Sequence, residues 1–166
     1  MNNLYYVIGA GAVAMFFAFW KTSWINKQPE GSDRMKQIGA SIADGAMAFL
    51  KAEYQVLAFF VIIVACLLAF AANSQGDSWL VSISFLSGAI SSALAGYLGM
   101  KVATKANNRT TNAAQSSLAK ALNVAFTGGS VMGMSVVGLG VLGVGSLFMI
   151  YDHFEFFNDT QKLIQT

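Results

Sequence analysis

The residues best suited to bind an anion are three basic side chains in one segment, Lys101, Lys105 and Arg109. They recur at every fourth position, so a helix would present all three on one face. Such a face could contact a phosphate group on the cytoplasmic side of a membrane. The alternative is that these residues anchor the ends of membrane helices and bind lipid phosphates. Spacing alone leaves both interpretations open.

The acidic residues do not form a recognisable set of metal ligands. Half of them are scattered ahead of the second apolar run, at Glu30, Asp33, Asp44 and Glu53. The only histidine, His153, follows the last apolar run. Hydrolysis of a phosphoanhydride with Mg²⁺ needs several converging carboxylates. We therefore assign no catalytic residue and no metal ligand to this chain.

Motifs for nucleotides, nucleic acids and disulfides are missing as well. No glycine-rich loop ends in Gly-Lys-Ser or Gly-Lys-Thr, so there is no P-loop. The run Gly-Leu-Gly-Val-Leu-Gly at 138–143 could pass for a dinucleotide fingerprint, but it lies inside an apolar stretch without a preceding strand. The net charge of +2 is too small to indicate nucleic acid as a partner. A single cysteine, Cys66, excludes an internal disulfide and fits a small packing residue.

The composition is typical of a membrane protein. Apolar residues make up 55% of the chain and charged residues 11%, against about 25% charged residues in soluble domains. Four uncharged stretches come close to or exceed the roughly 20 residues that cross a ~30 Å hydrocarbon core, and the fourth is longer than one crossing requires. They cover residues 4–20, 54–72, 79–100 and 121–151. Backbone polar groups in lipid must be satisfied internally, so we predict an all-α, polytopic bundle of about four transmembrane helices.

The second helix is predicted to begin well before its membrane-spanning part. Ser32 or Asp33 can cap its start. Apolar residues then recur at roughly helical spacing, at Met35, Ile38, Ile42, Met47 and Leu50. A helix from Asp33 to Ala72 would be about 60 Å long at 1.5 Å per residue. About half of it would then project beyond the ~30 Å hydrocarbon core.

The basic residues predict the orientation in the membrane. All but one of the ten Lys and Arg residues lie in or beside the two long connections between apolar stretches. The positive-inside rule makes that side cytoplasmic and places both termini outside. The bundle is expected to occupy residues 1–151, followed by an extracytoplasmic tail at 152–166. Several tail residues are candidates to cover the outer membrane surface: Phe154, Phe156, Phe157, Leu163 and Ile164.

Small residues are predicted to mediate helix packing, because helices in lipid associate where small side chains allow close approach. The third apolar stretch carries such residues at every fourth position, at Ser84, Gly88, Ser92 and Gly96. The fourth carries Gly129 and Gly133 at the same spacing. The partner is either another helix of this chain or a helix beyond it. A pore-lining role for the glycines is the alternative.

Charged residues at membrane depth would mark an ion path. The sequence has none in the central part of a predicted crossing. Asp44, Lys51 and Glu53 are expected near the cytoplasmic edge of the second helix. The chain is therefore not expected to contain the ion gate of a pump.

Three ordered stretches carry a family resemblance: GAMAFLKAEY at 45–54, AGYLGMKVATKANNRT at 95–110 and AKALNVAFTGGSVMGMSVVGLGVLG at 119–143. Together they resemble the first four helices of the membrane-integral pyrophosphatases, which couple hydrolysis of inorganic pyrophosphate to proton or sodium pumping. The resemblance implies a homodimer with two concentric rings of helices, in which these four belong mainly to the outer ring. It also implies Mg²⁺, and in one subclass K⁺, at a site on inner-ring helices.

The chain lacks the pyrophosphate-binding segment of that family, which is rich in Asp with Lys and Glu. We therefore expect an N-terminal, outer-ring portion that is inactive alone, whether as a fragment, a truncated product or one piece of a split protein. Its expected partners are membrane lipids and the remaining helices of the pump, in the plasma membrane of a prokaryote. The alternative is a stand-alone four-helix transporter, channel or assembly subunit. The choice between protons and sodium, and any need for K⁺, stays open.

Overall fold

The computed structural model describes residues 2–75 and 80–153, which form four α-helices. These are α1 (Asn2–Asn26), α2 (Asp33–Gln75), α3 (Leu80–Ala114) and α4 (Leu118–His153). Each helix is long and apolar enough to cross a membrane, which confirms the prediction of an all-α membrane protein. Trp79 and the predicted tail from residue 154 onward lie outside the described residues.

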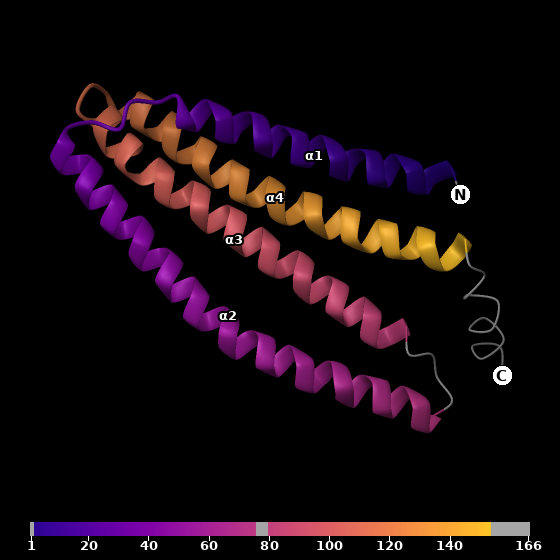
Figure 1. Cartoon of the computed structure of the whole chain (residues 1–166). Helices are drawn as coiled ribbons and strands as arrows, with labels where there is room; N and C mark the ends of the chain where they lie inside the picture. The colour runs from indigo at the N-terminus through magenta and orange to yellow at the C-terminus, as the bar shows by residue number, and fades with distance from the viewer. Residues whose placement is uncertain (1, 76–79, 154–166) are drawn as a thin grey trace.

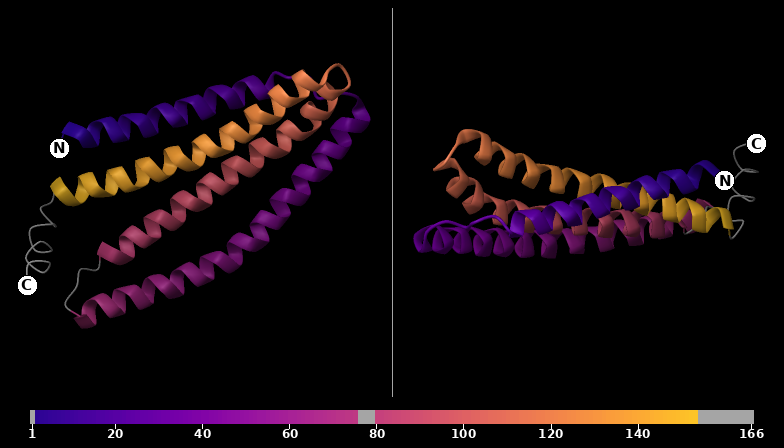
Figure 2. Two further views of the ribbon diagram at one scale, coloured as in Figure 1. Left: turned by 180° about the vertical axis from the view of Figure 1, so that it is seen from behind. Right: turned by 90° about the horizontal axis from the view of Figure 1, so that it is seen from above.

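The helices lie side by side in one curved layer, in the spatial order α1, α4, α3, α2 (Figures 1 and 2). Each inner helix packs along both of its neighbours, and α1 also touches α3 across one face of α4. The consecutive helices α1 and α2 occupy opposite edges and do not pack on each other within the described part of the chain. The layer is therefore open rather than closed into a ring.

The connections alternate between the two ends of the layer (Figure 1). The α1–α2 and α3–α4 connections, which hold or adjoin most basic residues, lie at one end, called here the basic end. The start of α1 and the end of α4 lie at the other end. The placement of the basic end in the cytoplasm remains a prediction from the positive-inside rule.

Hydroxyl caps define where two of the helices begin. Ser32 Oγ accepts a hydrogen bond from the Met35 amide at 3.4 Å, and Ser117 Oγ accepts one from the Lys120 amide at 3.2 Å. These bonds satisfy amides that have no partner within the first helical turn. Helix α2 then runs for 43 residues, or about 65 Å at 1.5 Å per residue.

A small cluster of buried apolar side chains lies where α1, α3 and α4 meet. Its members are Ala18 and Ile25 of α1, Val102 and Ala106 of α3, and Val131 of α4. Many large apolar side chains are exposed instead, including Phe59 and Phe70 of α2. Such a surface fits a protein whose helices face lipid or further helices rather than water.

Candidate functional site at the basic end

The three basic residues predicted to contact an anion lie on α3 near the basic end, but the structure gives them different surroundings. Lys101 and Lys105 are exposed, whereas only 7% of Arg109 is exposed. Arg109 faces the α1–α2 connection, and both lysines line a pocket between α1, α3 and α4. The three side chains therefore do not form one open basic patch.

Arg109 uses its guanidinium group to hold three groups of its own chain. Its Nη2 donates to Glu30 Oε1 at 2.6 Å, and its Nε donates to the Gln28 carbonyl oxygen at 3.2 Å. Its Nη1 donates to the Lys105 carbonyl oxygen one turn earlier on α3, at 2.7 Å. The anion bound by Arg109 is thus the Glu30 carboxylate, which any external anion would have to displace.

The backbone around Glu30 is shaped to reach α3. Asn112 Nδ2 donates to the Pro29 carbonyl oxygen at 3.3 Å. Gly31 follows with φ of +89°, a left-handed conformation that glycine adopts without steric cost. A Cβ atom at Gly31 would also lie 3.1 Å from Asn112 Oδ1. We call this arrangement the Arg109 clasp: the contacts of Gln28, Pro29 and Glu30 with Arg109 and Asn112.

Sequence reasoning missed Glu30 as the partner of Arg109. The two residues are 79 positions apart, and the acidic residues of that segment follow no pattern that singles one out. The only local signal is the Pro-Glu-Gly order at 29–31, which is typical of a turn. A turn predicts a change of direction but not the surface on which it packs.

The pocket lined by the two lysines has a volume of about 260 Å³. Its other lining residues come from all three helices: Met15, Ala18, Phe19 and Thr22 of α1, Leu98 and Val102 of α3, and Val131 and Ser135 of α4. Lys101 Nζ lies 3.4 Å from Tyr97 Oη and 5.4 Å from the centre of the Tyr97 ring. Among the side chains that the structure describes, no carboxylate lies within 4.0 Å of either lysine.

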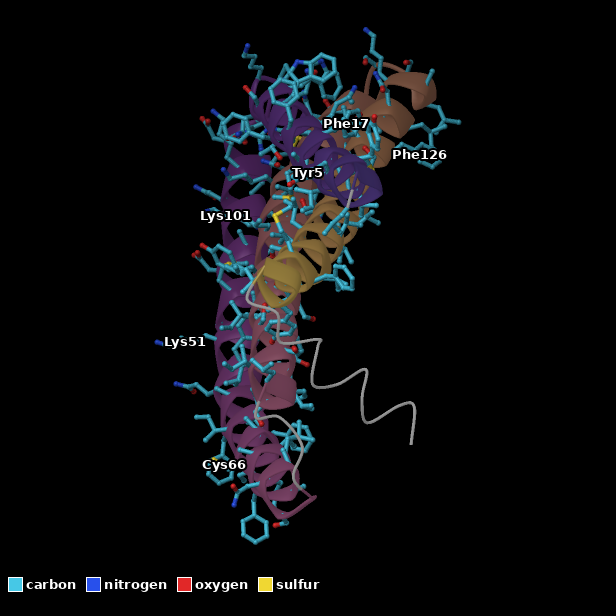
Figure 3. All side chains as sticks on the ribbon, turned by 90° about the vertical axis from the view of Figure 1, so that its right-hand side faces the viewer. Tyr5, Phe17, Lys51, Cys66, Lys101 and Phe126 are labelled. Carbon is cyan, nitrogen blue, oxygen red and sulfur yellow. The ribbon has the colours of Figure 1, made fainter. Side chains whose placement is uncertain are left out.

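Aromatic rings lie close to Lys21, which follows the uncharged stretch of α1 as Lys101 follows that of α3. Lys21 Nζ lies between 5.2 and 5.8 Å from the ring centres of Phe17, Trp20 and Trp24. Lys and Trp together are typical of the interface between hydrocarbon and water. In Figure 3, Lys101 and Lys51 project from one side of the layer, and Phe126 projects from the other.

The residues predicted to pack helices together also divide into two groups. Ser84 Oγ lies 2.9 Å from Tyr151 Oη, which joins α3 to α4. A Cβ atom at Gly96 would lie 2.7 Å from Tyr54 Oη, so Gly96 lets α2 approach α3. Gly88 and Ser92 are exposed and line a groove of about 600 Å³ between α3 and α4.

Gly129 and Gly133 are exposed, and a Cβ atom at either would meet no described atom within 4 Å. The adjacent Gly128 does meet α3, because a Cβ atom there would lie 2.9 Å from Ala106 Cβ. The regular spacing identified helices that carry small residues along one face, but it did not identify which glycines contact a neighbouring helix.

The described part of the chain holds no group of three or more His, Cys, Asp or Glu residues that could bind a metal ion.

Comparison with known proteins identifies relatives over nearly the whole chain. Residues 12–166 match the family described as inorganic H⁺ pyrophosphatase. The chain is 51% identical over 129 residues to a putative K⁺-stimulated pyrophosphate-energized sodium pump of Clostridium tetani, covering 78% of this chain and 18% of that protein. It is 39% identical over 142 residues to a K⁺-insensitive pyrophosphate-energized proton pump of Methanosarcina mazei, covering 86% of this chain and 21% of that protein.

A third relative is a K⁺-insensitive pyrophosphate-energized proton pump 2 of Moorella thermoacetica, 43% identical over 150 residues, covering 90% of this chain and 21% of that protein. The chain thus spans about a fifth of the length of these relatives. The names of the relatives divide between sodium and proton pumps, and between K⁺-stimulated and K⁺-insensitive ones.

Proposed function

The chain belongs to the inorganic H⁺ pyrophosphatase family, and from this membership we propose that it forms the N-terminal, outer-ring part of a pyrophosphate-energised proton or sodium pump. The observation that carries the proposal is the match over residues 12–166, together with coverage of only about a fifth of each relative. In this proposal the four helices scaffold the inner ring and anchor it in lipid.

The chemistry of the pump would reside in other helices. Mg²⁺-dependent hydrolysis requires converging carboxylates, and the described residues hold no such cluster. In this proposal Mg²⁺ and any K⁺ bind to helices outside this chain, and the residues of the ion gate also belong to those helices. The complete pump would be a homodimer in the plasma membrane of a prokaryote.

A charged residue of α2 supports the presence of further helices. Tyr54 donates its hydroxyl hydrogen to the Ala93 carbonyl oxygen at 2.6 Å, so the adjacent Glu53 lies at the level of the uncharged part of α3. That level is about two helical turns, or ~12 Å at 1.5 Å per residue, deeper than Lys101. Glu53 is exposed, and no basic side chain among the described residues lies within 4.0 Å of it.

Exposure of a carboxylate to lipid at that depth would be unfavourable, by up to about 3 kcal/mol on insertion scales for acidic residues. The sequence alone predicts that Glu53 lies near the cytoplasmic edge of the membrane. In this proposal Glu53 lies deeper than that edge, and a polar group of another helix, or water enclosed by other helices, faces this side of α2. The open edges of the layer are consistent with the same proposal.

Two measurements test the proposal. The reading frame after the codon for Thr166 should continue with further hydrophobic spans and an Asp-, Lys- and Glu-rich cytoplasmic segment, or a neighbouring frame should supply them. The purified 166-residue chain should show no Mg²⁺-dependent release of phosphate from pyrophosphate. Turnover by that chain would refute the proposed division of labour. A stop codon after Thr166, with no neighbouring reading frame that encodes further helices, would favour a stand-alone channel or transporter if reconstituted oligomers also conduct ions.

A further inference from the structure

We propose that the pocket between α1, α3 and α4 binds an anionic phospholipid, with the lipid phosphate on Lys101 and Lys105 and part of an acyl chain along the apolar lining. This proposal goes beyond the scaffold function, and it stands whether or not the chain is part of a pump. It assigns the two lysines to a membrane lipid and leaves Arg109 to the clasp.

The shape of the pocket suits an acyl chain. Its floor is formed by Val131 and Ser135 of α4, which are 1% and 2% exposed. Its walls come from α1 and α3, which converge over that face of α4. Met15 and Phe19 provide apolar surface on one wall, and Leu98 provides it on the other. An apolar lining of this kind offers little to a small inorganic anion and much to a hydrocarbon chain.

The charge at the rim of the pocket suits a phosphate diester. Lys101 and Lys105 lie one helical turn apart on α3 and are both exposed. The carboxylate of Glu30 is bound to Arg109, and the pocket itself is lined by no acidic residue among those described. The two ammonium groups are therefore available to an anion from the membrane.

The depth of the pocket matches the position of lipid headgroups. Lys101 ends the uncharged stretch of α3, and Lys21 with its aromatic neighbours ends that of α1. Lys and Trp in this arrangement mark the membrane interface. Leu98, Met15 and Phe19 lie on the hydrocarbon side of these lysines along their helices. A lipid could thus place its phosphate on the lysines and its acyl chain in the pocket without leaving its leaflet.

The test measures retained lipid on the purified full 166-residue chain. The chain would be mixed in detergent with phosphatidylglycerol or phosphatidylcholine of the same acyl chains, and bound lipid would be counted by native mass spectrometry. The test variant is Lys101→Gln with Lys105→Gln. The matched control is Lys51→Gln with Lys120→Gln, which removes the same charge from exposed sites outside this pocket. Circular dichroism would verify that both variants remain helical.

We expect retention of phosphatidylglycerol to fall about 25-fold in the test variant and to change less than twofold in the control, because each of the two lysines contributes about a fivefold preference for an anionic lipid. The unmodified chain should bind phosphatidylcholine more weakly than phosphatidylglycerol of the same acyl chains. It should also bind dihexanoyl phosphatidylglycerol, which has the same headgroup but short acyl chains, more weakly than the long-chain lipid. Equal retention by the test and control variants would overturn the proposal. Displacement of the lipid by millimolar inorganic phosphate would overturn it too, because the lysines would then form a simple phosphate site.

A second measurement addresses a protein occupant. A photoreactive residue in place of Phe19, which is exposed and lines the pocket, would be activated in the native membrane. We expect cross-links to phospholipid. Cross-links to a protein segment in place of lipid would overturn the proposal and would identify the pocket as a docking site for another helix.

Discussion

Replacing Arg109 with alanine should loosen the basic end of the layer, because one side chain there holds both the α1–α2 connection and the end of α3. The substitution removes the bond to the Glu30 carboxylate at 2.6 Å and the bonds to two carbonyl oxygens at 2.7 and 3.2 Å. It also removes the packing of a side chain that is only 7% exposed. The released groups differ in how readily water can replace their lost partner.

The side chain of Glu30 is 42% exposed, so its carboxylate regains water and its bond contributes about 1 kcal/mol or less. The carbonyl oxygens of Gln28 and Lys105 were bonded to a charged donor, a contact worth about 1.5 kcal/mol or more when buried. We expect Arg109→Ala to lower the free energy of unfolding by about 2–4 kcal/mol. Glu30→Gln, which preserves an acceptor but not the charge, should lower it by about 1 kcal/mol.

Intrinsic tryptophan fluorescence during heating in detergent is the suitable assay, because Trp24 lies at the end of α1 beside the Gln28 turn. Thiol-reactive dyes are unsuitable because Cys66 is already exposed in the folded chain. A loss of 2–4 kcal/mol corresponds to a decrease in Tm of roughly 5–10 °C for a chain of this size. Lys120→Ala, which removes an exposed charge nearby, serves as the control and should change stability by less than about 0.5 kcal/mol. Equal effects of Arg109→Ala and Lys120→Ala would refute the reasoning.

Three further predictions concern the helices themselves. Gly128→Ala should destabilise the chain by about 1–3 kcal/mol relative to Gly129→Ala. Both changes raise helix propensity alike, but of these two glycines only Gly128 lies close to α3. Equal melting temperatures of the two variants would contradict this prediction. Tyr54→Phe should cost about 0.5–1.5 kcal/mol through loss of the bond to Ala93, and an unchanged melting temperature would exclude that bond. Cys66, in the apolar part of α2, should resist a membrane-impermeant maleimide in intact vesicles and react after detergent is added, whereas rapid labelling in vesicles would place it in water.

The extent of the helices was only partly predictable from hydropathy. The uncharged stretches located all four helices, but α3 and α4 continue well into the polar segment around residues 101–120. Hydropathy reports where a helix enters water, not where it ends. The start of α2 at Asp33 is the exception, since a capping side chain and apolar residues at helical spacing are visible in the sequence.

The division of the basic residues was not predictable. Spacing placed Lys101, Lys105 and Arg109 on one helix face, and a helix does contain all three. Their separate environments depend on Glu30 and on α1, which are distant in sequence. In the same way, Gly128 rather than Gly129 meets α3 because of how α4 is rotated against its neighbours.

The sequence by itself determined the membrane class, the number and type of helices and the family, because uncharged length, charge distribution and ordered motifs are properties of the chain read in one direction. Only the tertiary structure decided the order α1, α4, α3, α2, the pairing of Arg109 with Glu30 and the pocket lined by two lysines. These features depend on which faces of separate helices meet. That choice is set by the mutual packing of several helices, which no single segment encodes.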